Sequence, residues 1–263
     1  MHVGTDLAGR HALVCGASKG IGRASALAMA ERGAALTLLA RSRGQLEAVA
    51  EQALARGAPA ARVLVADLDD HATLEASVRE HLEAFGPVHV LVNNTGGPPG
   101  GPLLDASPEV FEAAFRRHVL AAQLLARLLV PGMREAGYGR IVNVLSTSVR
   151  EPIDNLGVSN TIRAAMAGWA KSLSRELPPG VTINNVLPGY TDTERLSSLA
   201  AANGERTGRT PEAVRQGWIA QVPEGRLGLP EELGAVVAFL ASPAAAYVRG
   251  VSLPVDGGRL RSI

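Results

Sequence analysis

The chain has 263 residues, of which 46% are hydrophobic and 3% aromatic, and 26 basic residues nearly balance 25 acidic ones. This length predicts one α/β domain with a sizeable core, and the balanced charge argues against nucleic acid or a membrane as a partner. The single cysteine, Cys15, excludes an internal disulfide and a cysteine-based metal cluster, so we expect no metal. The segment from Met1 to Arg10 does not resemble a secretion signal, and no run of about eighteen apolar residues predicts a membrane span. We therefore expect a cytoplasmic protein that acts on a small-molecule substrate.

Short apolar runs alternate with longer amphipathic runs along the whole chain. This alternation predicts βαβ crossovers, and hence a three-layer, doubly wound α/β fold of the Rossmann type. Its single seven-stranded parallel sheet would carry helices on both faces. The expected strands are 11–15, 35–40, 61–66, 88–92, 140–145, 181–186 and 250–255, and the expected helices include 21–32, 43–56, 72–85, 108–135, 155–177 and 230–240.

No linker rich in Pro, Gly or Ser divides the chain, so we interpret 1–263 as a single dinucleotide-binding domain. The polar segment 190–222 interrupts the pattern after the sixth expected strand, and we expect it to form a lid or substrate loop. The helical runs 108–135 and 155–177 are rich in apolar and small residues, more than one side of a sheet needs to bury. We therefore expect a homo-oligomer.

A glycine-rich turn follows the first expected strand and leads straight into a helix. Glycines permit a tight turn and a close approach of backbone N–H groups to a pyrophosphate, and the helix N-terminus adds its dipole. The spacing G-x-x-x-G-x-G differs from the generic G-x-G-x-x-G fingerprint, and a purely structural turn is the alternative interpretation. The candidate phosphate-binding residues are Gly16, Ser18, Lys19, Gly20, Ile21 and Gly22.

Further short motifs follow in a fixed order, each at the end of an expected strand. They are Asp67-Leu68, Asn93-Asn94-Thr95-Gly96, Ser146, and Pro188-Gly189 with Thr193. Together with the glycine turn, over about residues 6–260, they resemble the short-chain dehydrogenase/reductase family, and most closely its bacterial 3-oxoacyl-[acyl-carrier-protein] reductase branch. The resemblance implies a nicotinamide-dependent oxidoreductase acting on a carbonyl or alcohol, assembled as a tetramer of 222 symmetry or as a dimer.

The same resemblance assigns the cofactor contacts. It implies that Asp67 and Leu68 lie near the adenine, and that Pro188, Gly189 and Thr193 lie along the nicotinamide. The motif residues Asn93, Thr95 and Gly96 complete the implied cofactor-binding set.

The end of the second expected strand indicates which dinucleotide is bound. Enzymes that use NAD usually place an acid there to bind the ribose 2′-hydroxyl, whereas this chain has Ala40 followed by Arg41. Arg41, with Lys19 nearby, can pair with a 2′-phosphate. We therefore expect NADP(H) to be preferred over NAD(H). The alternative is that Arg41 is a solvated loop charge.

The catalytic positions depart from the family pattern. Aligned without gaps, the family's tyrosine position is Ser159, its lysine position is Arg163 and its asparagine position is His118, while the serine is kept as Ser146. A serine hydroxyl is a much weaker acid than tyrosine, and arginine stays charged and cannot relay a proton. Ser159 and Arg163 share a helix face, so Arg163 can still hold the nicotinamide ribose.

Two residues are candidates to replace the missing proton donor. Tyr190 directly follows Pro188-Gly189, and His118 has a suitable intrinsic pKa, although a packed helix histidine is the alternative for His118. The Gly/Pro run 94–102 predicts an irregular loop that borders the cofactor or substrate, with a simple spacer as the alternative.

Three functions therefore remain open at this point. The first is an NADP(H)-dependent oxidoreductase with non-standard catalytic residues. The second is a nucleotide-binding sensor or partner subunit without turnover, which the loss of Tyr and Lys favours. The third is a non-redox lyase or isomerase that reuses the pocket, because one fold carries many functions.

Overall fold

A parallel sheet of seven strands forms the centre of the computed structural model, which describes residues 4–98 and 100–262. The strand order is β3-β2-β1-β4-β5-β6-β7, so the order reverses between β1 and β4. Ligands of such sheets bind beyond the carboxyl ends of the strands, at this reversal. The strands are β1 (His11–Cys15), β2 (Ala35–Ala40), β3 (Ala61–Val65), β4 (Val90–Asn93), β5 (Gly139–Val144), β6 (Val181–Pro188) and β7 (Ser252–Val255).

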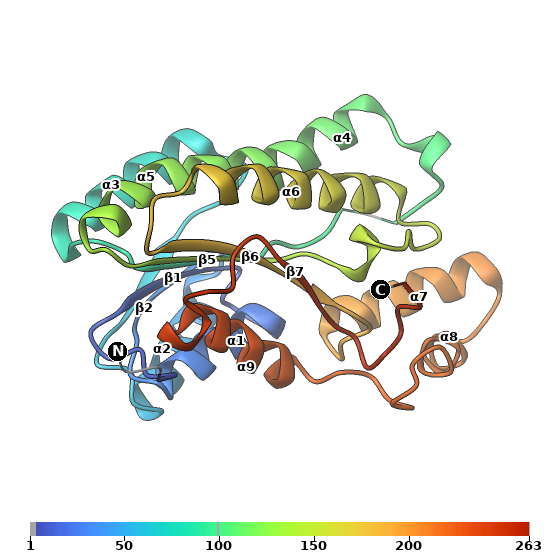
Figure 1. Ribbon diagram of the computed structural model, residues 1–263. Coiled ribbons are helices and arrows are strands. Elements are labelled where there is room, and N and C mark those ends of the chain that lie inside the picture. Colours follow the sequence, from blue (N-terminus) through green and yellow to red (C-terminus); the bar gives the residue numbers. More distant parts are fainter. Residues whose placement is uncertain (1–3, 99, 263) are drawn as a thin grey trace.

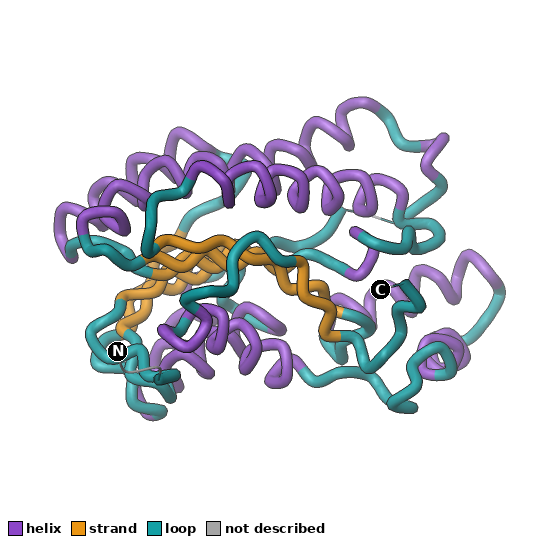
Figure 2. Tube along the Cα trace, in the orientation of Figure 1, coloured by secondary structure: helices purple, strands orange, loops and turns teal. Residues whose placement is uncertain are grey.

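Helices cover both faces of the sheet, so the molecule has three layers (Figure 1) and the strands of Figure 2 lie between two sets of helices. This arrangement confirms the expected doubly wound α/β fold. One face carries α1 (Gly20–Ala30), α2 (Arg43–Ala55) and α9 (Pro230–Ala241), and the other carries α3 (His71–Phe85), α4 (Pro108–Phe115), α5 (Ala121–Glu135) and α6 (Gly157–Glu176).

The strands are buried on both faces, and β1 shows how its sequence meets that requirement. Successive side chains of a strand point to opposite faces. Ala12 and Val14 join the apolar cluster beneath α1 and α9, whereas Leu13 and Cys15 join the cluster beneath α3 and α5. An apolar residue is therefore needed at nearly every position of the strand.

The expected helix 108–135 is interrupted, and the interruption positions a candidate site residue. A π-helical turn at Arg116–Leu120 separates α4 from α5. Such turns widen the helix locally and occur often at functional sites. His118 lies within this turn and is buried.

The seventh strand also begins later than expected, at Ser252 rather than at residue 250. Gly250 has a φ of 73°, a left-handed conformation that does not continue a strand.

The segment 190–222 folds into two helices, α7 (Glu194–Thr207) and α8 (Pro211–Ile219), which follow β6 and lie apart from the two helical layers (Figure 1). Thr193 and Thr210 cap these helices by accepting hydrogen bonds from the amides of Leu196 and Ala213. In the part of the chain that the structure describes, no helix is long and apolar enough to cross a membrane. Pro99, within the Gly/Pro run, lies outside the described residues.

Candidate functional site

A cleft of about 950 Å³ opens at the carboxyl ends of the strands, between the glycine turn and the segment 190–222. Its volume is in the range of small-molecule sites. Most of the residues expected from the sequence to form the site line this cleft. They are Gly16, Ser18, Lys19, Gly20, Ile21, Arg41, Asp67, Leu68, Thr95, Gly96, Ser146, Ser159, Arg163, Pro188, Gly189, Tyr190 and Thr193.

The glycine turn is tightly built. Gly16 has a φ of 59°, and a Cβ on Gly22 would lie 2.1 Å from the carbonyl oxygen of Gly16. Gly22 therefore permits the close approach of helix and turn, but it does not line the cleft. The amide of Asn94 donates to the carbonyl oxygens of Cys15 and Gly16, at 3.4 and 3.3 Å. Asn94 therefore lines the cleft and braces the glycine turn, although it was not among the residues expected to bind the cofactor.

Asn93, in contrast, points into the sheet rather than into the cleft. Its amide donates to Oδ1 of Asn143 at 2.8 Å, and Asn143 donates in turn to Oδ1 of Asn185 at 2.8 Å. These buried amides link β4, β5 and β6. The structure therefore gives Asn93 a position in the sheet, whereas its neighbours Asn94, Thr95 and Gly96 line the cleft.

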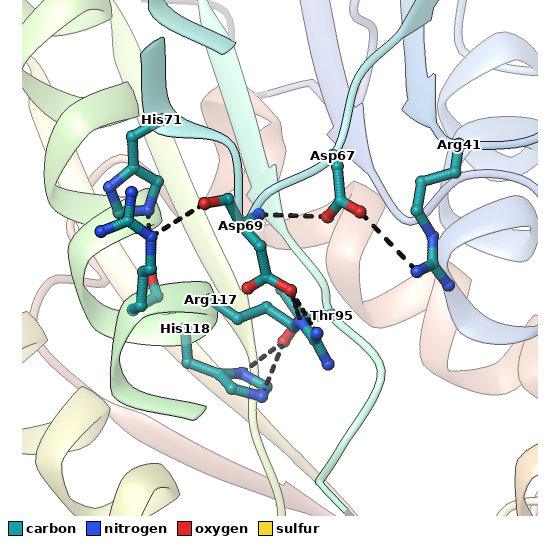
Figure 3. Close-up of polar contacts among 8 residues, drawn as sticks. Arg41, Asp67, Asp69, His71, Thr95, Arg117 and His118 are labelled. Atoms are coloured by element: carbon teal, nitrogen blue, oxygen red, sulfur yellow. Dashed lines mark hydrogen bonds and ion pairs between the residues drawn. The ribbon is translucent and has the colours of Figure 1, made fainter. Parts of the chain in front are cut away.

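Two cations at the glycine-turn end of the cleft already have acidic partners. Arg41 lies 3.7 Å from Asp67 (Figure 3), and Lys19 lies 2.5 Å from Glu194 of α7. All four side chains are substantially exposed, so both pairs are weak and can exchange for a stronger anion such as phosphate.

Arg163 is buried, and its hydrogen bonds within the described residues go to backbone carbonyls. Its Nη1 donates to Val144 at 2.8 Å and its Nη2 to Thr95 at 3.3 Å. Burial, and then the charge of Arg195, lower the pKa of Arg163 to about 10. The group remains charged at neutral pH, and it ties the ends of β4 and β5 together.

His118 does not reach the cleft. It borders a separate void of about 10 Å³, the size of one water molecule, together with Thr95 and Arg163. Its ring is hydrogen-bonded to the hydroxyl of Thr95 (Figure 3). Burial, together with the charges of Arg163 and Arg117, lowers the pKa of His118 to about 2. The imidazole is therefore neutral at physiological pH.

Ser146 and Ser159 both line the cleft beside Arg163. Ser146 is the second residue after β5, and its Oγ accepts a hydrogen bond of 3.0 Å from the backbone amide of Ser148. Ser159 lies in the first turn of α6, one turn before Arg163. Two serine hydroxyl groups and a guanidinium thus line the same cleft.

Tyr190 forms part of the cleft wall and packs between two side chains. Its ring stacks on Trp218, with centroids 5.3 Å apart, and the guanidinium of Arg259 lies 4.8 Å from the ring centroid. Its hydroxyl donates to Gln221 through a long hydrogen bond of 3.4 Å. Sequence reasoning missed this arrangement, because Arg259 and Trp218 come from distant parts of the chain.

Comparisons with known proteins agree with this geometry. The family model described as enoyl-(acyl carrier protein) reductase matches residues 16–259. The 3-oxoacyl-[acyl-carrier-protein] reductase of Pseudomonas aeruginosa is 34% identical over 260 residues, which cover 98% of this chain and 100% of the relative. The 2,3-dihydroxy-2,3-dihydro-p-cumate dehydrogenase of Pseudomonas putida is 33% identical, with coverages of 96% and 95%.

Solved structures show the same likeness. The L-sorbose reductase from Gluconobacter frateurii, complexed with NADPH and L-sorbose, has a TM-score of 0.92 at 29% identity, covering 98% of this chain and 99% of the other. An NAD⁺-bound xylitol dehydrogenase has a TM-score of 0.89 at 28% identity, with coverages of 96% and 99%.

The fold and the site therefore define a dinucleotide-binding α/β protein of the oxidoreductase type. More specifically, the chain belongs to the short-chain dehydrogenase/reductase family, and 3-oxoacyl-[acyl-carrier-protein] reductases are among the relatives that match nearly its whole length.

Proposed function

We propose that the protein is an NADP(H)-dependent oxidoreductase that interconverts a carbonyl and an alcohol with non-standard catalytic residues. The observation that carries this proposal is the single cleft that joins the glycine turn to Ser146, Ser159 and Arg163. Its relatives that reduce or oxidise such groups add support. We further propose that residues 1–263 form a single domain and that the segment 190–222 acts as a lid or substrate loop over the cleft.

The residues present fit a nicotinamide dinucleotide. The turn from Gly16 to Ile21 would hold the pyrophosphate on backbone amides, and Asp67 with Leu68 would border the adenine. Two of the five guanidinium N–H groups of Arg163 bind backbone carbonyls, and the remaining N–H groups would donate to the nicotinamide ribose. When bound, the nicotinamide supplies or accepts the hydride.

The phosphorylated form of the cofactor is the better match. The residue that follows β2 is Arg41 rather than an acid, and Arg41 lines the cleft. Its ion pair with Asp67 is weak, so a 2′-phosphate can replace Asp67 as its partner. The relatives include both kinds, because one solved structure contains NADPH and another NAD⁺. The preference therefore rests on Arg41 itself.

The chain's own groups can stabilise the charge that develops on a substrate oxygen. The hydroxyls of Ser146 and Ser159 would donate hydrogen bonds, and the fixed charge of Arg163 would lower the energy of an alkoxide. Because His118 stays neutral and outside the cleft, it would position Thr95 rather than deliver a proton. Tyr190 is then the proposed proton donor, since it lines the cleft and its hydroxyl makes a long hydrogen bond of 3.4 Å to Gln221.

The first experiment is a titration with NADPH and NADH, followed by NADPH oxidation across a panel of aldehydes, ketones and 3-oxoacyl thioesters. Gly22→Ala should abolish nucleotide binding, because the new Cβ would meet the Gly16 carbonyl at 2.1 Å. Gly44→Ala is the matched control, because its Cβ would meet nothing within 4 Å. A protein that binds neither nucleotide would contradict the proposal.

A second function is favoured by the residues at the two altered positions. With Ser159 and Arg163 in place of a tyrosine and a lysine, the cleft can bind nucleotide without the family's usual acid. Tight NADPH binding without turnover on the whole panel would indicate a nucleotide-binding sensor or partner subunit instead.

We also propose that the protein forms homo-oligomers. Leu104 is 99% exposed, and Leu103, Phe115 and Leu120 are also exposed on the same side of the molecule as α4 and α5. Such apolar residues commonly mark an interface. Sedimentation should show a dimer or tetramer at micromolar concentration, and Leu104→Glu should shift it toward monomer; a monomeric parent protein would defeat this proposal.

A further inference from the structure

Arg195, the second residue of α7, turns away from the glycine turn. Its neighbours face that turn, because Glu194 pairs with Lys19 and the side chain of Thr193 lies 3.5 Å from where a Cβ on Gly20 would be. Nη2 of Arg195 instead donates to the carbonyl oxygen of Pro98 at 2.6 Å. The guanidinium therefore lies against the Gly/Pro run 94–102 rather than against the glycine turn.

Two guanidinium groups converge at this point. A Cβ on Gly97 would lie 3.5 Å from Nη2 of Arg195 and 4.0 Å from Nη2 of Arg163. Only the absence of a side chain at Gly97 leaves space beside both groups. Both side chains line the cleft, but Arg195 is exposed whereas Arg163 is buried.

This pair of charges has no acidic counterpart. Lys19, Arg41 and Arg117 each have an ion-pair partner, but within the described residues no carboxylate lies within 4.0 Å of Arg163 or Arg195. Asp154 also lines the cleft, yet no ion pair joins it to either arginine. Uncompensated like charges at one point of a cleft are unfavourable unless an anion binds between them.

The cofactor contacts proposed above use Arg163, at the nicotinamide ribose, but they do not use Arg195. The cofactor pyrophosphate is assigned to the amides of the glycine turn, and a 2′-phosphate to Arg41, on the side that Glu194 and Thr193 face. Apolar side chains line the same cleft: Leu199 lies one helical turn after Arg195 on α7, and Leu156 and Leu199 lie 3.3 and 4.0 Å from where a Cβ on Gly100 would be. The cleft thus combines apolar walls with a guanidinium that has no acidic partner among the described residues.

We propose that Arg195 binds a carboxylate of the substrate, so that the proposed oxidoreductase selects short oxo acids, or the corresponding hydroxy acids, with an apolar body. The inference rests on the proposed function for the reaction, but the anion site itself does not require turnover. A guanidinium fork matches a carboxylate through paired hydrogen bonds, and the buried charge of Arg163 strengthens the attraction.

The test measures binding without catalysis. Calorimetry on the protein saturated with NADP⁺ compares 3-oxohexanoate with its methyl ester, which has the same ketone and no charge. Since NADP⁺ cannot reduce a ketone, the complexes are stable. We expect the acid to bind at least about tenfold more tightly than the ester. In Arg195→Gln this difference should disappear, while NADPH affinity stays within about twofold.

Arg209→Gln is the matched control, because Arg209 belongs to the same segment but does not line the cleft. It should keep the discrimination of the parent protein. Equal binding of acid and ester would overturn the proposal, and so would a large loss of NADPH affinity in Arg195→Gln, which would assign Arg195 to the cofactor. If inorganic phosphate displaces 3-oxohexanoate at a concentration below that of 3-oxohexanoate itself, the site prefers phosphate, and the carboxylate proposal is wrong. Selective acid binding without NADPH oxidation would leave the anion site standing and remove the reductase function alone.

Discussion

The ammonium group of Lys19 lies 2.5 Å from the carboxylate of Glu194, so an ion pair joins the glycine turn to the first residue of α7. Both side chains are more than half exposed, and such pairs contribute only about 0–1 kcal/mol. A cofactor phosphate can therefore displace the carboxylate without a large cost.

Glu194→Gln should raise the affinity for NADPH by roughly two- to fivefold, because it frees Lys19 and removes a negative charge near the phosphates. Fluorescence titration at low salt measures the change. Glu205→Gln, an exposed position on the same helix that does not line the cleft, should have no effect. Unchanged or weaker binding in Glu194→Gln would show that Lys19 does not serve the nucleotide.

Arg41→Asp should remove most of the preference for NADPH over NADH, a change of about tenfold or more, because it loses a charge-assisted contact and adds repulsion. The ratio of the two dissociation constants is the measurement. Arg43→Asp is the control, because Arg43 pairs with Glu47 outside the cleft. If Arg41→Asp keeps the parent ratio, another residue reads the 2′-phosphate.

Arg163→Ala should weaken NADPH binding by about 1.5–3 kcal/mol, the scale of a lost charge-assisted hydrogen bond. Ser159→Ala, one turn earlier on α6, should leave it nearly unchanged. Because Arg163 also binds two backbone carbonyls, its loss could disturb the cleft as a whole. The control therefore measures how tightly the parent protein and Arg163→Ala bind adenosine 2′,5′-bisphosphate, which lacks the nicotinamide ribose. Affinity for that fragment should persist; its loss would mean that the alanine variant damages the whole cleft.

Tyr190→Phe should lower kcat by about a hundredfold or more while NADPH affinity is kept, since general acid catalysis contributes on that scale. The ring stack with Trp218 survives the substitution, so packing is preserved. Tyr247→Phe is the control, because Tyr247 is fully exposed. Full activity in Tyr190→Phe would leave Tyr190 with a packing role and assign proton delivery to water or to the serine hydroxyls.

A buried histidine cluster at the opposite end of the sheet predicts acid sensitivity. The hydroxyl of Thr37 lies 2.7 Å from the ring of His11 and 2.9 Å from that of His81. Burial, then the nearby His81, Arg62 and His89, lower the pKa of His11 to about 4 from 6.5.

Since the folded state disfavours the charged form of His11, the unfolded state takes up the proton first as pH falls. The free energy of unfolding should therefore be constant above pH 6.5 and decline toward pH 4, with about 3 kcal/mol from His11. Urea denaturation at several pH values measures this. His11→Asn, which keeps a polar partner for Thr37 but does not titrate, should flatten the profile. His71→Asn is the control, and an equally steep profile in His11→Asn would exclude His11 as the source.

Much of the fold could be predicted because it depends on local pattern. Strands β1 and β2 begin and end at the residues expected, since apolar runs bounded by polar turns identify buried parallel strands. The π-helical turn at Arg116–Leu120 could not be predicted, because its residues suit an ordinary helix. The turn packs against α6 and holds His118 against Thr95, and these contacts between distant segments leave no local pattern in the sequence.

By itself, the sequence determined the doubly wound sheet, the glycine turn and the two altered catalytic positions, Ser159 and Arg163. Those features follow from periodicity and from the order of short motifs along the chain. Tertiary structure alone decided how the side chains face one another. It turned Asn93 into the sheet, buried His118 so that it stays neutral, and brought Arg195 beside Arg163. These outcomes depend on burial and on charges from segments far apart in sequence, which no local pattern records.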